Sequence, residues 1–298
     1  MMLTTQQAST LAEQVRRVPD EALASESSNV VLRPSNGWNA LDLRDLWNYR
    51  ELLYFLAVRD VSVRYKQTLL GAAWAILQPV LTMVVFSVFF GHLGKIPSDG
   101  IPYPIFAFCA LLPWQLFASS VTQSGNSLIS SQNLITKVYF PRLVIPIAPV
   151  LSALVDFGIA FGVLIIMMLY YGVVPQWTLI TLPLFIALDL LACLSVGIWL
   201  SAMNAMYRDI RYTIPFLVQF WMFITPVAYP ASMVPEKWRW VYGLNPMTGV
   251  VEGFRWALLG TTEFPAVYLC VSVPVTIVLL ITGMYYFKRV ERSFADRI

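Results

Sequence analysis

Few ionisable side chains that could do chemistry lie inside the apolar parts of this chain, and two of them are carboxylates. Asp156 and Asp189 lie near the middle of the apolar runs 143–171 and 179–203. A charged group in such a place is costly in hydrocarbon and is by default a functional candidate. The pair raises one chemical hypothesis, a proton relay in a proton-coupled secondary transporter. The two halves of the chain show no inverted repeat, which many such transporters have, and we interpret both carboxyls as interior hydrogen-bonding groups.

Enzymatic and metal chemistry have no visible basis in the sequence. The chain contains no G-x-x-x-x-G-K-[ST] loop, which would cradle nucleotide phosphates, and no arrangement of a nucleophile beside a base. Its single histidine, His92, ends an apolar stretch. Cys109, Cys193 and Cys270 have neither metal nor disulfide spacing, and we interpret them as packing residues. We therefore expect no catalytic residue, no metal site and no cofactor.

The elements that must carry these residues are long enough to cross a bilayer. Hydrophobic residues make up 58% of the chain and charged residues 12%, and residues 67–94 contain no Asp, Glu, Lys or Arg. A hydrocarbon core about 30 Å thick needs roughly 20 helical residues, because a helix satisfies its own backbone polar groups. The sequence predicts an all-α integral membrane protein with six transmembrane helices, at about 69–93, 104–124, 143–171, 179–203, 213–230 and 264–287.

The positive charges next to alternate ends of these spans predict their orientation. Short loops rich in Lys and Arg stay in the cytoplasm, so both termini are expected inside. Ten cations fall on the inner side, and Lys95, Lys237, Arg239 and Arg255 fall on the outer side. The inner set is Arg59, Arg64, Lys66, Lys137, Arg142, Arg208, Arg211, Lys288, Arg289 and Arg292.

Three regions are expected along the chain. Residues 1–37 are polar, lack an apolar run that could be a signal peptide, and predict a disordered cytoplasmic tail. Residues 38–66 contain an amphipathic helix at about 42–59, which we expect to lie along the inner membrane surface, to pack on another protein, or to do both. Residues 67–298 form the six-helix membrane domain, with no sign of nucleic-acid binding.

The segment Pro226–Gly260, between the last two spans, is too rich in proline to cross the membrane and too apolar for an exposed loop. Irregular backbone at membrane depth is tolerated only where protein or a water-filled cavity surrounds it. We therefore predict two short re-entrant helices, at about 235–242 and 246–258, that form an outer gate. The expected gate residues are Tyr229, Trp238, Trp240, Asn245 and Pro246.

Several stretches in the same order carry a resemblance to a known family. They are VRDVSVRYKQTLLGAAWAILQPV at 58–80, LFASSVTQSGNSLISSQNLITKVYFPR at 116–142, MYRDIR at 206–211, and PVAYPASMVP with GLNPMTGVVEGFRWALLG near the end. Together they cover almost all of the chain after residue 45. The chain resembles the permease subunit of type-2 ABC exporters of lipid-linked polysaccharide, the O-antigen, capsule and teichoic acid permeases. The sequence does not distinguish among these three polymers, nor does it give the polymer length.

The resemblance implies a multi-pass protein of the bacterial inner membrane that acts as a homodimer. It further implies a separate ABC ATPase dimer on the cytoplasmic side, and a channel between the two permease copies for an undecaprenyl-linked polysaccharide. The missing P-loop agrees with this division of labour. Whether the ATPase partner carries a carbohydrate-binding domain cannot be read from this chain.

Two inner loops are candidates for binding such an ATPase. The loop 133–142 is short, basic and aromatic, and Asn133, Lys137, Tyr139 and Phe140 form the first candidate contact. Lys137 and Arg142 could instead serve topology alone, but topology does not explain the aromatic pair, so we favour a contact with the ATPase. The second candidate contact is the group Tyr207, Arg208 and Asp209.

A glycan channel is expected to be lined by aromatic rings, because pyranose rings present apolar C–H faces that stack on them. Phe216, Phe220 and Phe223 recur on one face of the fifth span. In the first span Trp74, Gln78 and Phe89 share a face. Each of these rings could also be an ordinary packing or lipid-facing residue, and it is the resemblance that favours a channel.

Overall fold

The computed structural model describes residues 43–66, 73–174, 176–260, 263–291 and 294. All regular elements in these ranges are helices, and none of the described residues forms a strand. The predicted all-α class is therefore confirmed for this part of the chain. The predicted tail at 1–37 and residues 38–42 lie outside the described residues.

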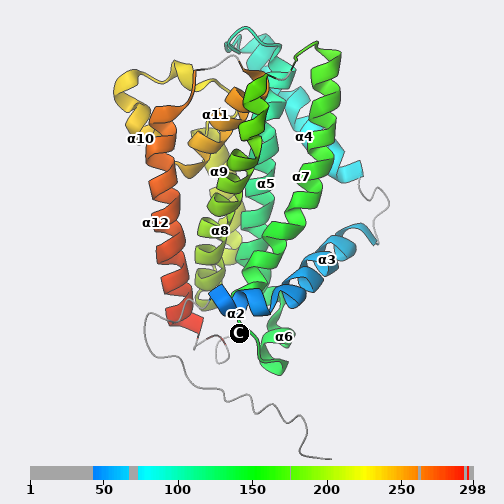
Figure 1. Ribbon diagram of the computed structural model, residues 1–298, viewed down its shortest axis with the longest axis vertical. Coiled ribbons are helices and arrows are strands. Elements are labelled where there is room, and N and C mark those ends of the chain that lie inside the picture. Colours follow the sequence, from blue (N-terminus) through cyan, green and yellow to red (C-terminus); the bar gives the residue numbers. More distant parts are fainter. Residues whose placement is uncertain (1–42, 67–72, 175, 261–262, 292–293, 295–298) are drawn as a thin grey trace, which may run out of the picture. The chain divides into compact units, whose positions relative to one another are not determined.

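Five helical elements are long and apolar enough to cross a membrane (Figure 1). They correspond to the first four and the last of the predicted spans. They are α4 (Ala73–Phe86) continued by the π-helix η3 (Ser87–Leu93), α5 (Tyr103–Ser130), α7 (Val144–Tyr170), the 3-10 helix η4 (Trp177–Thr181) continued by α8 (Leu182–Met206), and α12 (Ala266–Glu291).

The predicted fifth span, 213–230, corresponds to a shorter apolar helix, α9 (Ile210–Ile224). Its 15 residues extend about 22 Å, which is less than the thickness of a hydrocarbon core. The helix stops at Ile224 because Thr225 is extended, and Thr225 precedes a proline, which disfavours helical backbone. The sixth membrane crossing therefore stays a prediction.

Helix α5 lies at the centre of the described helices and is buried over most of its length. It packs against α7 and α8 on either side and also contacts α4 and α9. Small residues permit the close approach to α8: a Cβ added at Gly197 would lie 2.7 Å from the Ser124 hydroxyl oxygen. The polar residues of α5 are thus held in fixed relation to these four neighbouring helices.

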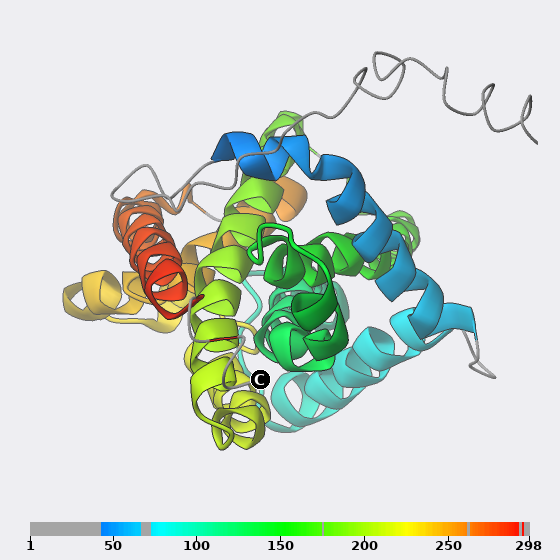
Figure 2. The same ribbon diagram turned by 90° about the horizontal axis from the view of Figure 1, so that it is seen from below.

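Two helices, α2 (Leu43–Asn48) and α3 (Arg50–Lys66), cross the end of the molecule from which α6 (Gln132–Lys137) projects (Figures 1 and 2). The predicted surface helix at 42–59 is therefore broken at Tyr49 and continues to Lys66. Helix α3 packs along α7 and buries Leu56 in a small apolar cluster with Phe140 and Phe287. This cluster packs α3 against the segment after α6 and the C-terminal part of α12.

The segment 226–260 folds at the opposite end from α2 and α3 (Figure 1). It contains η5 (Ala231–Met233), η6 (Glu236–Trp238), α10 (Arg239–Gly243) and α11 (Pro246–Leu259). Helical structure thus occurs where two short helices were predicted, at 235–242 and 246–258. Helix α11 is capped by Asn245, whose side chain accepts a hydrogen bond from the Met247 amide at 3.0 Å. The depth of these helices in a membrane stays a prediction.

Candidate functional site

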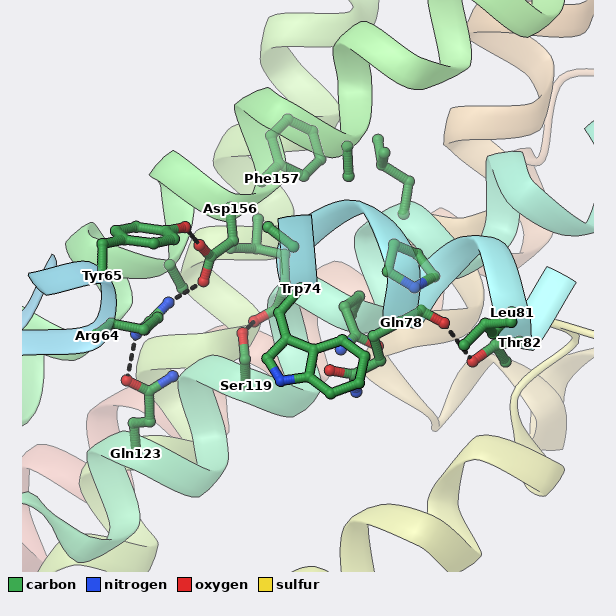
Figure 3. Close-up of a pocket in the computed structure, with 17 residues that line it drawn as sticks. Arg64, Tyr65, Trp74, Gln78, Leu81, Thr82, Ser119, Gln123, Asp156 and Phe157 are labelled. Carbon is green, nitrogen blue, oxygen red and sulfur yellow. Dashed lines mark hydrogen bonds and ion pairs between the residues drawn. The ribbon is translucent and has the colours of Figure 1, made fainter. Parts of the chain in front are cut away.

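A cavity of about 610 Å³ opens between the end of α3 and helices α4, α5 and α7. Figure 3 shows its polar wall, in which side chains from all four helices face the same space. We call it the polar cleft. Its polar lining residues are Arg64, Tyr65, Trp74, Gln78, Thr82, Gln115, Ser119, Gln123 and Asp156; the rest of the wall is apolar.

An ion pair between Arg64 and Asp156 closes one end of the polar cleft (Figure 3). The Arg64 guanidinium also donates to the Gln123 side-chain carbonyl at 2.5 Å and to the Ser152 hydroxyl at 3.4 Å. The Tyr65 hydroxyl donates to the second oxygen of Asp156. The prediction that Asp156 is an interior hydrogen-bonding group is confirmed, and its partners come from a helix about ninety positions earlier in the chain.

Asp189 does not belong to this network. It lies on α8, fully buried, where one carboxyl oxygen accepts a weak bond from the Cys193 thiol at 3.7 Å. Its other oxygen has no hydrogen-bond partner among the described residues. No hydrogen bond in the described part of the chain joins Asp189 to Asp156, so the structure does not assemble the two carboxyls into a relay.

The long wall of the polar cleft is a polar stripe on α5, formed by Gln115, Ser119 and Gln123. Their spacing of four residues places them on one face of the helix. The sequence analysis missed this stripe, although the i, i+4, i+8 pattern in an apolar span was a readable signal. Gln78 on α4 also lines the cleft.

The residues expected to line a substrate channel fall into two places. Trp74 and Gln78 line the polar cleft, whereas Phe89 and the three phenylalanines of α9 do not. Phe216, Phe220 and Phe223 form an exposed row on α9, with the Phe216 and Phe220 rings stacked at 6.4 Å. The opposite side of α9 is buried through Ile214 and Val218. The row is therefore free to face a channel, lipid or another chain.

The first expected ATPase contact divides into exposed and buried residues. Asn133, Lys137 and Tyr139 are exposed, with 76% of Tyr139 accessible. Phe140 is 5% accessible and packs in the cluster with Leu56. Two neighbouring aromatic residues that looked alike in sequence thus have opposite environments, and only Tyr139 is available to a partner without rearrangement.

The second expected ATPase contact is the turn between α8 and α9. Its three members, Tyr207, Arg208 and Asp209, are all exposed. The turn is tightened by backbone bonds from Tyr207 to Met203 and from Ile210 to Tyr207. The side chains therefore project from a defined turn.

Only two of the five expected outer-gate residues line a second hollow, which has a volume of about 550 Å³. Tyr229 and Trp238 line it, and the Tyr229 hydroxyl is hydrogen-bonded to that of Tyr242. Burial raises the pKa of Tyr242 above its usual value, so this hydroxyl stays protonated and able to donate. Trp240 is exposed and lies outside the hollow's lining.

Asn245 and Pro246 lie at the start of α11 and do not line this hollow. The Asn245 side chain accepts from the Trp221 indole at 2.9 Å and donates to the Thr225 hydroxyl at 2.9 Å. Pro246 is buried as the first residue of α11, a position where its missing N–H costs nothing. Asn245 thus holds the start of α11 against the end of α9.

Arg255 anchors the segment 226–260, a role that the charge pattern did not reveal. Its side chain is 1% accessible, forms an ion pair with Glu252 at 2.7 Å, and lies 3.8 Å above the ring of Phe106. It also donates to the carbonyls of Pro226, Val227 and Tyr229. The cation thus supplies the hydrogen bonds that this irregular backbone cannot make for itself.

The chain belongs to the ABC-2 type transporter family, whose model matches residues 51–259. Its five long apolar helices are consistent with a membrane permease of this family. It is 30% identical to the O-antigen export system permease protein RfbA of Myxococcus xanthus, over 86% of this chain and 98% of that protein. A Klebsiella pneumoniae protein of the same name is 28% identical over 83% of this chain and 94% of its own length. The polysialic acid transport protein KpsM of Escherichia coli is 28% identical over 80% of this chain and 93% of its own length. The chain is therefore a transport subunit of the bacterial inner membrane rather than an enzyme.

Proposed function

We propose that this protein is the membrane subunit of an ATP-driven exporter that moves a lipid-linked polysaccharide through a channel between two copies of the chain. The observation that carries the proposal is the nearly full-length match to permeases named for O-antigen export. The chain has no P-loop, so a separate ATPase polypeptide would hydrolyse ATP. Undecaprenyl is the proposed lipid carrier.

The proposed topology has six crossings, with α9 as the fifth and both termini in the cytoplasm. The inner cations flank α3, α6 and the turn before α9, in agreement with the rule that positive short loops stay inside. Helices α10 and α11 then belong to the outer side, where we propose that they form a re-entrant gate. Arg255 supports this arrangement because it satisfies backbone carbonyls that water would not reach.

The proposed ATPase contact is the inner surface formed by α6 and the turn before α9. Tyr139 and Lys137 are its exposed candidates, and Tyr207 to Asp209 extend it. Helix α3 packs on α7 and shares an apolar cluster with Phe140, so a push on α6 would reach the membrane helices through packed side chains. A rigid connection of this kind is what coupling to ATP hydrolysis requires.

The proposed path for the glycan follows exposed aromatic faces. Phe216, Phe220 and Phe223 on α9, with Trp74 and Phe89 on the first span, supply rings on which successive sugars could stack. Gln78 adds a hydrogen-bonding group beside Trp74. Stacking tolerates any register along the chain, which suits a sliding polymer. The rival idea of a proton relay has no support from the contacts of Asp156 and Asp189.

The test is surface polymer in a strain whose only permease is this chain, expressed with its ATPase. Replacing Phe216, Phe220 and Phe223 together by Ala should stop export and leave lipid-linked polymer inside the cell. Leu184→Ala, another exposed apolar residue, on α8, serves as the matched control and should not reduce export. Normal surface polymer in the triple variant would exclude this path.

A further inference from the structure

We propose that the polar cleft binds one neutral, hydroxyl-bearing sugar unit of the transported glycan, with Gln78 and Gln115 as its hydrogen-bonding residues. This inference rests on the function proposed above and names a binding site for the same substrate. The site differs from the aromatic row of α9, because none of the three phenylalanines lines the cleft.

The first argument is the state of the two glutamine side chains. Gln78 and Gln115 line the cleft, and neither side chain has a hydrogen-bond partner among the described residues. Each amide offers two donors and one acceptor, and both lie in apolar helices long enough to cross a membrane. Gln78 is exposed to the cleft and Gln115 is half-buried, so both amides can reach a polar molecule that enters it. Their donors and acceptors are therefore available to water or to a polar ligand.

The second argument is size and shape. A cavity of about 610 Å³ falls in the range of small-molecule sites, which are mostly apolar with a few placed polar groups. The polar groups here lie on two walls, the α5 stripe and the first turns of α4. A pyranose has hydroxyls around its rim and apolar C–H faces, so it matches this mixture better than an acyl chain does.

The third argument is the indole of Trp74. It lies one helical turn before Gln78 and also lines the cleft, with more than half of its surface accessible. A flat ring beside a free amide can stack on a sugar face while the amide binds its hydroxyls. Phe157 supplies a second aromatic side chain from α7.

The fourth argument is charge. The cleft contains one cation and one carboxylate, and these are already paired with each other. An anionic phosphate would have to displace Asp156 from Arg64 or lie beside its negative charge. A neutral sugar meets no such penalty, and it can still donate a hydroxyl to the carboxylate oxygens. The cleft therefore suits a sugar unit rather than a lipid phosphate.

The experiment is site-specific photocrosslinking in cells that make the polymer, with p-benzoylphenylalanine placed at one position at a time. Position 115 reports on the cleft, position 220 on the aromatic row, and position 166 on a side chain of α7 that is exposed and outside the cleft. Adducts are separated by gel, stained for glycan by periodate oxidation, and analysed for phospholipid by mass spectrometry. Glycan adducts at 115 and 220, with none at 166, are expected.

The possible outcomes distinguish failure of the sugar site from failure of the proposed exporter function. Glycan adducts at 220 but only phospholipid or nothing at 115 would overturn the sugar site and leave the exporter intact. No glycan adduct at either position, with unchanged surface polymer after loss of the chain, would overturn both.

A second measurement asks whether the free amides matter. Gln115→Leu keeps the size of the side chain and removes its hydrogen bonds, and it should slow export about two- to tenfold at unchanged membrane level. Thr82→Val is the matched control, because its hydroxyl also lines the cleft but already donates to the Gln78 backbone carbonyl at 2.8 Å. Equal export by the two variants would contradict the role of Gln115.

Discussion

The two ends of this molecule use an arginine paired with a carboxylate in different ways. At the end formed by segment 226–260, Arg255 and Glu252 are three residues apart on one helix and almost fully buried, with side-chain accessibilities of 1% and 8%. At the end where α3 lies, Arg64 and Asp156 come from different helices and keep accessibilities of 26% and 23%. Losing one partner of a fully buried pair leaves an uncompensated charge, whereas water can reach a partly exposed one.

This difference suggests different mechanical roles. Arg255 binds the backbone carbonyls of Pro226, Val227 and Tyr229. We therefore expect the segment 226–260 to move as one body if it moves at all. Arg64 joins α3 to α7, and separating these two helices should cost less free energy because water can reach their ion pair. Both ion pairs join an arginine to a carboxylate, and they differ mainly in how far they are buried.

The largest effect is expected for Arg255→Met. The substitution removes the hydrogen bonds to the backbone carbonyls and leaves the buried Glu252 carboxylate without its cation. This loss should destabilise the protein by about 3–5 kcal/mol. Thermal unfolding of the detergent-solubilised protein measures this loss. Arg239→Met is the control, because Arg239 pairs with Glu236 at 3.7 Å on the exposed part of the same segment, and it should change stability by less than about 1 kcal/mol. Equal effects would break the distinction between buried and exposed anchors.

The next effect separates the neighbours Phe140 and Tyr139. Phe140→Ala should destabilise the protein by about 3 kcal/mol, because it empties a buried place beside Leu56. Tyr139→Ala should leave unfolding unchanged and reduce copurification of the ATPase. In a double variant, a loss of ATPase copurification could come from unfolding or from a lost contact, so the two single variants are compared. Full ATPase recovery with Tyr139→Ala would remove this residue from the proposed contact.

A smaller effect is expected for the inner ion pair. A double-mutant cycle with Arg64→Met and Asp156→Asn should give a coupling energy of about 1–3 kcal/mol in thermal unfolding. The same cycle on Arg59 and Asp60, a pair at 2.8 Å on the same helix with 42% of Arg59 accessible, should give less than about 1 kcal/mol. A coupling energy at Arg64 and Asp156 as large as the loss from Arg255→Met would show that the two ends are anchored alike.

The smallest effect is expected for Asp189→Asn. The amide keeps the shape of the carboxyl and removes a group whose ionised form would leave one oxygen without a hydrogen-bond partner among the described residues. The free energy of unfolding and the activation free energy of export should each change by less than about 1 kcal/mol. Surface polymer and unfolding are the measurements, and complete loss of transport in a stable variant would revive the proton-relay hypothesis.

Local pattern was enough to predict much of the fold. Five of the six predicted spans correspond to long helices, because a bilayer demands about 20 apolar helical residues whatever the helix packs against. The helical parts of 226–260 were also readable, since prolines and the capping Asn245 act on their immediate neighbours. The length of α9 was less well predicted, because a hydropathy pattern does not register where Thr225 and Pro226 end the helix.

The candidate site depended on contacts that the pattern does not contain. Helical spacing places Gln115, Ser119 and Gln123 on one face, but it cannot say which helix that face meets. Adjacent aromatic residues such as Tyr139 and Phe140 have the same local signature, and only packing buries one and exposes the other.

By itself, then, the sequence determined the apolar helices, their approximate ends and the absence of a P-loop, because these follow from short-range properties of the chain. The tertiary structure alone decided that Arg64 meets Asp156, that Arg255 holds the outer segment, and that α4, α5 and α7 enclose a polar cleft. Such pairings join residues far apart in the chain, and they arise only when whole helix faces pack and exclude other partners.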